Sequence, residues 1–477
     1  MVQLDQINVL NRILKAVREG VLPPRLAALR TRLLASNTGR RLASGAFWSL
    51  LASVASRSFG LFSSIIIARL LGKETFGELG IIQSTLDMFG TIAGFSMGLT
   101  STKYVAECRS QNPLKAGRII AISSLVAWVC GGITVVVLVS LAPWLANKTI
   151  AAPQLAGLLQ VSAFSLLFGA VNGAQIGALS GFEAFRRVAQ VNLISGLLTF
   201  LFRVSGTVAF GLQGAVYGMV LAQAAGCAIN YAVLRQVATK AKVAIQFRHC
   251  LKELPVLWKF SLPTVLGSLV ALPVTWICNA MLVNQPGGYA EMGIFNAANQ
   301  WFFIILFIPG LLGQAAMPVL FERINAGDHR ESVKIFLTLL KINTIVFLPV
   351  ILVGCFSRTI MACYGSGFSN GWPTMVLSVV TAGLMALQMP AGYMIAAKNK
   401  MWIMLLMNAG WGAVFIGANE LLVRRGAFGL ALAKLIAVCL HSGWSFGYVL
   451  HTLRNHEGRG IRDLGVGLQK AEIIEPS

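Results

Sequence analysis

Charged residues are scarce in this sequence. Only 12% of its 477 residues are Asp, Glu, Lys or Arg, whereas 56% are hydrophobic, and the mean hydropathy is +0.72. A soluble domain usually carries about 25% charged residues. Water is therefore not the main solvent of the folded chain, and a soluble globular protein is excluded.

Acidic residues are scarcer than basic ones, with 17 Asp and Glu against 39 Lys and Arg and a net charge of +22. Such an excess could indicate a nucleic-acid partner, so the positions of the basic residues decide. Most of them fall in the amino-terminal segment, the carboxyl tail and every second connection between hydrophobic runs. This positive-inside pattern places both termini in the cytoplasm and argues against a nucleic-acid partner.

Motifs of catalysis and metal binding are also missing. The sequence has no phosphate-binding loop, no nucleophile elbow and no paired catalytic carboxylates, and its 8 Cys and 5 His show no metal-ligand spacing. The outer connections are too short to hold a catalytic domain. We therefore expect neither an enzyme nor an ATPase and no cofactor, with energy drawn from an ion gradient, the membrane potential or removal of the product.

Long hydrophobic runs recur instead, and each can cross a hydrocarbon core about 30 Å thick as a helix. The hydropathy predicts twelve membrane spans of an all-α membrane protein. The first six lie near residues 46–67, 76–99, 119–141, 155–180, 188–210 and 213–234. The second six lie near residues 260–283, 292–320, 335–356, 374–397, 401–423 and 427–450.

The spans divide the chain into four regions. Residues 1–42 are predicted to form a basic amphipathic segment on the cytoplasmic leaflet, with disorder as the alternative. Residues 43–240 and 241–455 form two lobes of six spans each. Residues 456–477 are expected to be a cytoplasmic tail.

An internal repeat relates the two lobes at an offset of 213 to 216 residues. The segment Phe76 to Ile81 aligns with Tyr289 to Ile294, and a pair of glycines between the last two spans of each half also aligns: Gly211 and Gly214 with Gly426 and Gly429. Six spans separate equivalent positions, so both lobes have the same topology. A parallel repeat of this kind predicts a cavity between two lobes related by an axis along the membrane normal.

Proline is nearly absent from the first six spans but recurs in the second six, at Pro263, Pro273, Pro309, Pro349 and Pro390. Each removes an intrahelical hydrogen bond and permits a kink. We expect the second lobe to bend more during function, with static packing as the alternative.

Ionisable residues inside the spans are candidates for function because an ionised side chain in hydrocarbon is costly. Arg57 and Asp87 each lie about eleven residues into adjacent, oppositely directed spans, so both should lie near the midplane. They could pair with each other. Alternatively, Arg57 faces the cavity and binds an anionic substrate, while Asp87 orients it or takes up the coupling proton or cation.

Arg203 and Lys434 lie at one depth in different lobes, each about seven residues from the outer end of its span. Neither has an acidic neighbour at helical spacing. Two unpaired cations facing one cavity suit a phosphate or pyrophosphate, which Arg binds in bidentate fashion and Lys as a point charge. Either side chain could instead extend to the outer interface.

Amide side chains form a third group. Asn296, Asn299 and Gln300 share one helix face, as their spacing requires. Such groups hydrogen-bond sugar hydroxyls, and Trp301 or Trp411 could stack on a sugar ring. The amides could equally join neighbouring helices.

The first two spans resemble the opening of bacterial polysaccharide-biosynthesis flippases of the Wzx, O-antigen type, which belong to the multidrug, oligosaccharidyl-lipid and polysaccharide exporter superfamily. The segments Ala43 to Trp48 and Ile65 to Gly77 carry the resemblance, which is strong over residues 43–107. It implies a V-shaped pair of six-helix bundles that alternates access across the bacterial inner membrane. The implied substrate is an undecaprenyl-pyrophosphate-linked O-antigen or exopolysaccharide unit, in a cationic cavity for which Arg57, Arg203 and Lys434 are the candidates.

Two rival functions come from the same superfamily. A cation-coupled multidrug antiporter should place carboxylates in its cavity, but this chain has one midplane acid against three intramembrane bases. A lipid II flippase is the second rival. Besides the lipid-linked oligosaccharide and membrane lipids, a polysaccharide polymerase and glycosyltransferases are candidate partners.

Overall fold

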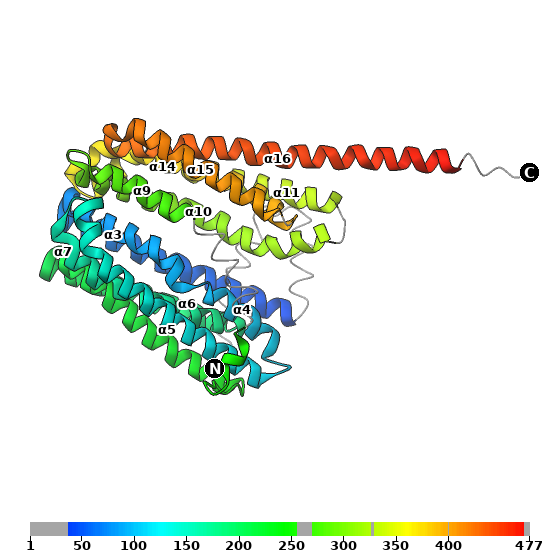
Figure 1. Cartoon of the computed structure of the whole chain (residues 1–477), viewed down its shortest axis with the longest axis horizontal. Helices are drawn as coiled ribbons and strands as arrows, with labels where there is room; N and C mark the ends of the chain where they lie inside the picture. Colours follow the sequence, from blue (N-terminus) through cyan, green and yellow to red (C-terminus); the bar gives the residue numbers. More distant parts are fainter. Residues whose placement is uncertain (1–36, 255–269, 326–328, 399, 472–477) are drawn as a thin grey trace, which may run out of the picture.

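The computed structural model describes residues 37–254, 270–325, 329–398 and 400–471, and every regular element in these ranges is a helix (Figure 1). Eight helical stretches in this part of the chain are long and apolar enough to cross a membrane. The all-α membrane fold predicted from hydropathy is therefore confirmed. The seventh predicted span is described only from residue 270 onward, so the total of twelve spans stays a prediction, as do the domain boundaries.

The helices form two bundles (Figure 1). The first bundle contains α3 (Asn37–Gly94), α4 (Met97–Cys108), α5 (Pro113–Trp144), α6 (Ala156–Gly181) and α7 (Phe185–Lys240). The second contains α9 (Ala271–Val283), α10 (Gly288–Asn325), α11 (His329–Thr344), α12 (Phe347–Cys355), α13 (Ser357–Cys363), α14 (Trp372–Ala397), α15 (Met401–Leu422) and α16 (Gly426–Ala471). Residues 1–36 of the predicted amphipathic segment lie outside the described residues, and α16 continues past the predicted start of the tail.

Two helices of the first bundle are too long for one crossing. α3 has 58 residues and α7 has 56, which would extend over roughly 85 Å if straight. Each instead reverses at a glycine with positive φ, Gly72 or Gly211. Each helix therefore supplies two crossings, which correspond to the first and last pairs of predicted spans in this half.

The same turns recur in the second bundle and show the internal repeat in the backbone. Gly287 and Gly426 also have positive φ, and each lies 215 residues after its counterpart (287 − 72 and 426 − 211). Gly429 faces the Leu422 carbonyl as Gly214 faces the Gly206 carbonyl. All four turns lie at one end of the molecule, which we call the closed end.

Two predicted spans are interrupted in the structure. The second ends its regular helix at Gly94, where Phe95 and Ser96 both adopt positive φ before α4 begins. The ninth is divided into α11 and α12. The hydropathy of the sequence did not indicate either break.

Glycines allow close helix packing inside the first bundle. A Cβ on Gly98 would lie 3.0 Å from the Gly173 carbonyl oxygen, and Gly177 faces the backbone of Gly98 still more closely. The glycine-rich face of α6 therefore packs directly on α4, which larger residues would prevent.

Hydrogen bonds join the two bundles at the closed end. Arg69 Nε donates to the Cys363 carbonyl at 2.6 Å, and the Tyr289 hydroxyl donates to the Ile150 carbonyl at 2.6 Å. Further from the turns, Trp276 Nε1 donates to Thr85 Oγ1 at 3.0 Å. At the other end, which we call the open end, the ribbons of α4 and α11 lie apart (Figure 1).

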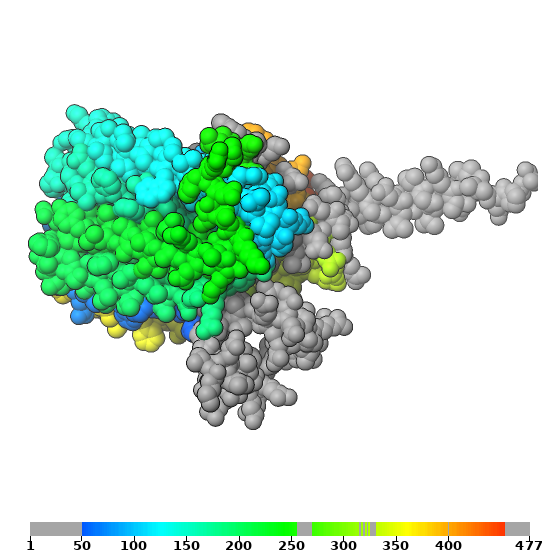
Figure 2. All heavy atoms as spheres, turned by 90° about the horizontal axis from the view of Figure 1, so that it is seen from below, coloured from blue at the N-terminus to red at the C-terminus, as the bar shows by residue number. Residues whose placement is uncertain are grey.

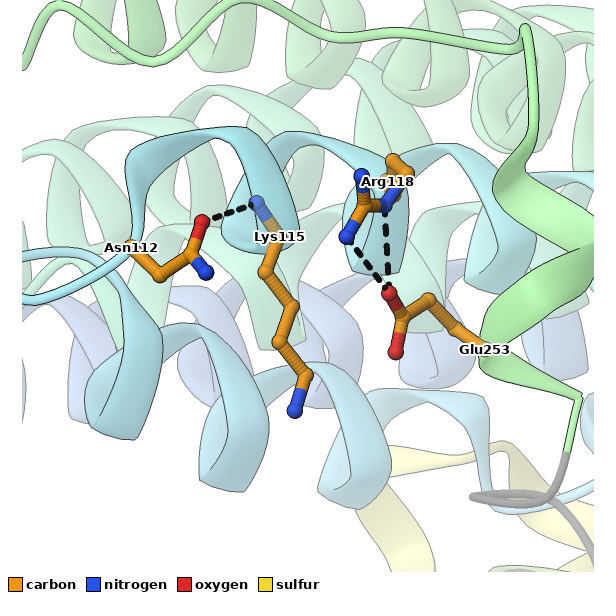
Figure 3. A network of polar contacts seen from close by, with 4 residues as sticks. All are labelled: Asn112, Lys115, Arg118 and Glu253. Atoms are coloured by element: carbon orange, nitrogen blue, oxygen red, sulfur yellow. Dashed lines mark hydrogen bonds and ion pairs between the residues drawn. The ribbon is translucent and has the colours of Figure 1, made fainter.

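The segment that follows α7 lies against the open end of the first bundle (Figure 2). Arg118 of α5 binds one carboxylate oxygen of Glu253 through Nε at 3.1 Å and Nη2 at 3.0 Å (Figure 3). Nearby, the backbone N–H of Lys115 donates to Asn112 Oδ1 at 3.0 Å. Asn112 is therefore the N-cap of α5. The chain is thus fixed to the first bundle up to Glu253.

Pro390 is one of the prolines predicted to lie inside the spans of the second half. It lies inside α14, and because it has no N–H it leaves the carbonyl of Ala386, four residues earlier, without its helical partner. Asn343 Nδ2 of α11 donates to that carbonyl at 2.6 Å. The helical bond lost at Pro390 is therefore replaced by a bond to another helix. Whether this region bends during function stays a prediction.

Candidate functional site

Arg57 lies in the first arm of α3 and contacts the second bundle. Its side chain is exposed, and its guanidinium carbon lies 4.2 Å from the centre of the Phe307 ring of α10. A guanidinium over an aromatic face is a favourable cation–π contact that leaves the N–H groups at its edge available. Arg57 therefore lies between the two bundles.

Arg57 and Asp87 are not paired in this conformation. Both residues lie 15 positions from the turn at Gly72, but no ion pair joins them. Asp87 is exposed and has no hydrogen-bond partner among the described residues. It shares a helix face with Ser84, which accepts a bond from Asn279 of α9 at 2.8 Å. Equal depth in the membrane does not determine which way a side chain points. Arg57 therefore contacts Phe307, whereas Asp87 lies on the helix face of Ser84.

Arg203 lies in the first arm of α7, beside α3. The contacts of Ser56 with Gly196 and of Phe59 with Phe200 set the register of these two helices. The same register places Arg203 level with Ser63. Arg203 Nε and Ser63 Oγ are both buried without a hydrogen-bond partner among the described residues. A buried donor of this kind is costly unless something binds it.

Lys434 of α16 is held inside the second bundle. Its Nζ donates to Asn299 Oδ1 of α10 at 3.1 Å and lies 3.7 Å from the centre of the Phe302 ring. Its amine therefore does not extend to the outer interface. Asn299 lies eight residues before Phe307, so the sites of Lys434 and Arg57 are about 12 Å apart along α10.

The three amide side chains of α10 contact two different parts of the protein. Gln300 donates through Nε2 to Ser64 Oγ of the first bundle and accepts at Oε1 from the Tyr364 hydroxyl. Asn296 Nδ2 is buried without a partner beside Gly80 of the first bundle. Asn296 and Gln300 therefore face the first bundle, whereas Asn299 faces Lys434.

The two tryptophans proposed for sugar stacking already have protein partners. Trp301 Nε1 donates to the Tyr364 hydroxyl at 3.2 Å. Trp411 packs on Phe415 with 5.5 Å between ring centres. The hydrogen bond of Trp301 is at the edge of its ring, whereas Phe415 packs on Trp411 at an interplanar angle of 43°.

Sequence reasoning missed a polar cluster in the second bundle. Gln388 of α14 contacts His441 Nδ1 through its amide nitrogen and accepts from Ser442 Oγ at 2.8 Å. The amide nitrogen also lies 3.4 Å from Ser445 Oγ. The signal was present, since Gln388 and His441 are polar residues inside predicted spans. Only the pairing of α14 with α16 shows that they meet.

The chain matches the family model described as "Polysaccharide biosynthesis protein" over residues 42–323. It belongs to this family. The match covers more than half of the chain and includes Arg57, Asp87, Arg203 and the α10 amides, but not Lys434.

Two curated relatives are both named EPS I polysaccharide export inner membrane protein EpsE. The protein of Ralstonia nicotianae is 28% identical over 60% of this chain and 72% of its own length. That of Ralstonia solanacearum is 24% identical over 81% of this chain and 89% of its own length. Both names and the apolar helices indicate that this chain is a multi-pass inner-membrane protein of polysaccharide export.

Solved transporters share the fold. An inward-facing multidrug transporter of the MATE family and MOP superfamily aligns with a TM-score of 0.71 and 15% identity, over 84% of this chain and 96% of that one. An outward-facing structure of a MATE family transporter gives 0.66 and 14%, over 89% and 98%. A MOP superfamily transporter from Pyrococcus furiosus, whose title describes a binding pocket of reverse polarity, gives 0.63 and 14%, over 89% and 98%. At these identities the likeness concerns the fold alone.

Proposed function

We propose that the protein carries an undecaprenyl-pyrophosphate-linked oligosaccharide from the cytoplasmic to the periplasmic leaflet by alternating access. The polysaccharide family and the export relatives support the substrate class. The observation that carries the proposal is the set of three intramembrane cations, none of which has a carboxylate partner within the described residues. A pyrophosphate would supply the missing negative charge.

The three cations suit different parts of this task. Arg57 lies between the bundles with the edge of its guanidinium available, and Arg203 has a buried N–H that nothing binds. Both can grip phosphate oxygens in bidentate fashion. Lys434 is held by a neutral amide, Asn299, which a phosphate could displace.

The distribution of basic residues supports the orientation. Lys115 and Arg118 lie at the open end, as do Arg186 and Arg187 in the first turn of α7. The positive-inside rule makes this end cytoplasmic. The described conformation would then face the cytoplasm, where the lipid-linked oligosaccharide is made, with its periplasmic end closed. A polymerase on the far side would remove the delivered unit, and glycosyltransferases on the near side would supply it.

Reconstitution in liposomes tests the proposal. A fluorescent polyprenyl-pyrophosphate oligosaccharide is followed into the opposite leaflet for wild type, Arg57→Ala and Arg203→Ala. A charge-assisted hydrogen bond contributes about 1.5–3 kcal/mol, so each variant should lose roughly ten- to a hundredfold in transport efficiency. Arg187→Gln is the matched control, because it removes an exposed cation at the open end whose side chain bonds Gln190.

Two results would contradict the proposal. One is equal loss in the Arg187→Gln control, because the effect would then come from overall charge. The other is absence of flipping by wild type under every imposed gradient together with efflux of cationic dyes. That outcome would favour the multidrug antiporter, with the exposed Asp87 as its carboxylate.

A further inference from the structure

The cluster around Gln388 joins α14 to α16 at a weak point of α14. Gln388 lies two residues before Pro390, within the turn whose carbonyl at Ala386 has lost its helical partner and bonds Asn343 instead. Its amide contacts His441, Ser442 and Ser445, which all lie on α16. α16 therefore holds α14 at its proline kink.

The first bundle has an equivalent cluster without a histidine. α6 and α14 have 26 residues each, and their bounds differ by 216, so Asn172 corresponds to Gln388. On the helices they face, Asn230 corresponds to Ser445 at an offset of 215. In the first bundle, Asn230 Nδ2 of α7 donates to Asn172 Oδ1 of α6 at 3.0 Å. In the second, the donor is on the other helix: Gln388 Nε2 of α14 donates to Ser445 Oγ of α16. The polar contact is thus a feature of both halves.

Position 441 is where the two clusters differ. Its counterpart in the first bundle is Gly226, and a Cβ there would lie 3.5 Å from the Asn172 amide nitrogen. The second bundle places an imidazole at the position where the first has no side chain. Histidine is the side chain whose charge changes most readily near neutral pH, so only the second of the two clusters can respond to a proton.

The hydrogen bonds define what a proton would change. Gln388 Oε1 is taken by the Ser442 hydroxyl, so the amide nitrogen faces His441 Nδ1 and donates to it. Nδ1 can accept this bond only while it carries no proton. When Nδ1 takes up a proton from water, two donors face each other. Gln388 must then turn its amide so that Oε1 accepts from Nδ1–H, and the Ser442 hydroxyl must change from donor to acceptor.

We propose that His441 is a proton-binding site whose occupation rearranges the hydrogen bonds between α16 and the kinked turn of α14, so that protonation and bending of the second bundle are coupled. This role in transport rests on the proposed function; the proton-dependent movement does not. His441 lies 15 residues from Gly426, about 22 Å along α16 from the closed end. Its side chain is half-buried.

Other ionisable groups near the cluster do not bond His441. On the described surfaces of the neighbouring elements these are Tyr393 of α14, Lys400 at the start of α15, and Lys434, Tyr448 and His451 of α16. Lys434 is bound to Asn299 of α10, and the Tyr393 hydroxyl lies against Gly313 of the same helix. On the part of the chain described, Gln388 is the hydrogen-bond partner of the imidazole.

The test measures movement without substrate. Spin labels at Met389 on α14 and Leu440 on α16, in the full chain in lipid nanodiscs, report the distance distribution between pH 5 and pH 8.5. Wild type should show two populations whose proportions change between these pH values. His441→Asn can place an amide oxygen near the position of Nδ1 and accept from Gln388 without titrating, so it should stay in the high-pH population throughout.

Two further variants keep the test decisive. His441→Gln is the second non-titrating variant, for use if His441→Asn does not yield monodisperse protein. His451→Gln removes a histidine from the same helix outside the cluster and should behave as wild type. A wild-type distribution that does not change with pH would overturn the proposal, as would a pH response that persists in both His441 variants.

Transport assays under an imposed pH gradient separate this inference from the proposed function. A gradient should accelerate flipping by wild type several-fold and leave the rate of His441→Asn unchanged. If wild type never flips the lipid but the pH-dependent movement is present and lost in His441→Asn, the substrate is wrong and the proton site stands. If wild type flips the lipid but shows no pH-dependent movement, the proposed function stands and the proton site is wrong.

Discussion

Gly77 of the first bundle and Gly293 of the second meet backbone to backbone at the closed end. A Cβ on Gly77 would overlap the carbonyl of Tyr289, and one on Gly293 would overlap the carbonyl of Lys73. Both glycines lie in the segments that carry the internal repeat. Closure of this end thus depends on two positions that tolerate no side chain.

Gly293→Leu should therefore prevent closure of this end. The added side chain has only backbone to displace, so the two bundles must separate. Spin labels at Thr75 and Gln285 should report a longer distance than in wild type, and transport should fall at least tenfold. Gly132→Leu is the control, because a Cβ at Gly132 meets nothing within 4 Å; an equal effect of that variant would contradict the prediction.

A cross-link between positions 64 and 300 should arrest transport. Gln300 of α10 bonds Ser64 of α3 in the described conformation. Cysteines at these two positions are therefore close enough for a short bismaleimide linker. We expect the Ser64→Cys, Gln300→Cys double variant to lose transport on linking, whereas each single variant treated in the same way keeps it. Undiminished transport by the linked protein would mean that this end does not open.

The contact of Lys434 with Asn299 should appear as an energetic coupling. Lys434→Met and Asn299→Leu each leave a polar group unpaired, whereas the double variant leaves none. The two effects on thermal stability in detergent should therefore be non-additive by about 0.5–3 kcal/mol. Lys434→Met combined with Asn296→Leu is the control and should be additive, because Asn296 faces the first bundle.

Lys398, in the connection between α14 and α15, gives a pH-dependent prediction. Its Nζ is buried without a partner among the described residues, and burial lowers the pKa of this amine. The folded state therefore penalises the charged form at neutral pH, and the penalty is relieved as pH rises from the lowered pKa toward the unfolded value of about 10.4.

Lys398→Met should accordingly melt at a higher temperature than wild type at pH 7, with the difference shrinking toward pH 10. Thermal unfolding followed by size-exclusion chromatography measures it. Lys400→Met is the control, because that side chain is exposed. A difference that grows with pH would show that the lysine stabilises its surroundings.

Hydropathy and the repeat were enough to predict the fold, because membrane helices must satisfy their own backbone and the spacing of apolar runs records this directly. The turns at Gly72 and Gly211 fall where spans were predicted to end. The break at Phe95 and Ser96 could not be predicted, since neither residue type favours positive φ.

The candidate site was harder to predict because depth follows from residue number but direction does not. Arg57 and Asp87 share a depth and still diverge. Asn299 was grouped with Asn296 and Gln300 by helical spacing, but its bond to Lys434 depends on how α10 packs against α16. The cluster at His441 needed the same knowledge of which helices are neighbours. Which of these residues contact a substrate stays a prediction.

The backbone of this protein is nearly twofold symmetric, but its charge is not. At the offset of 215 set by the paired glycine turns, Arg57 corresponds to Leu272, Arg203 to Ala418 and Lys434 to Met219. Neither half could therefore reproduce this pattern of cations by pairing with a copy of itself. Joining the halves in one chain let each diverge: the amino-terminal half carries both arginines, and the other gained the prolines and the histidine. The two halves therefore share helix turns but differ in the side chains that can bind an anion or a proton.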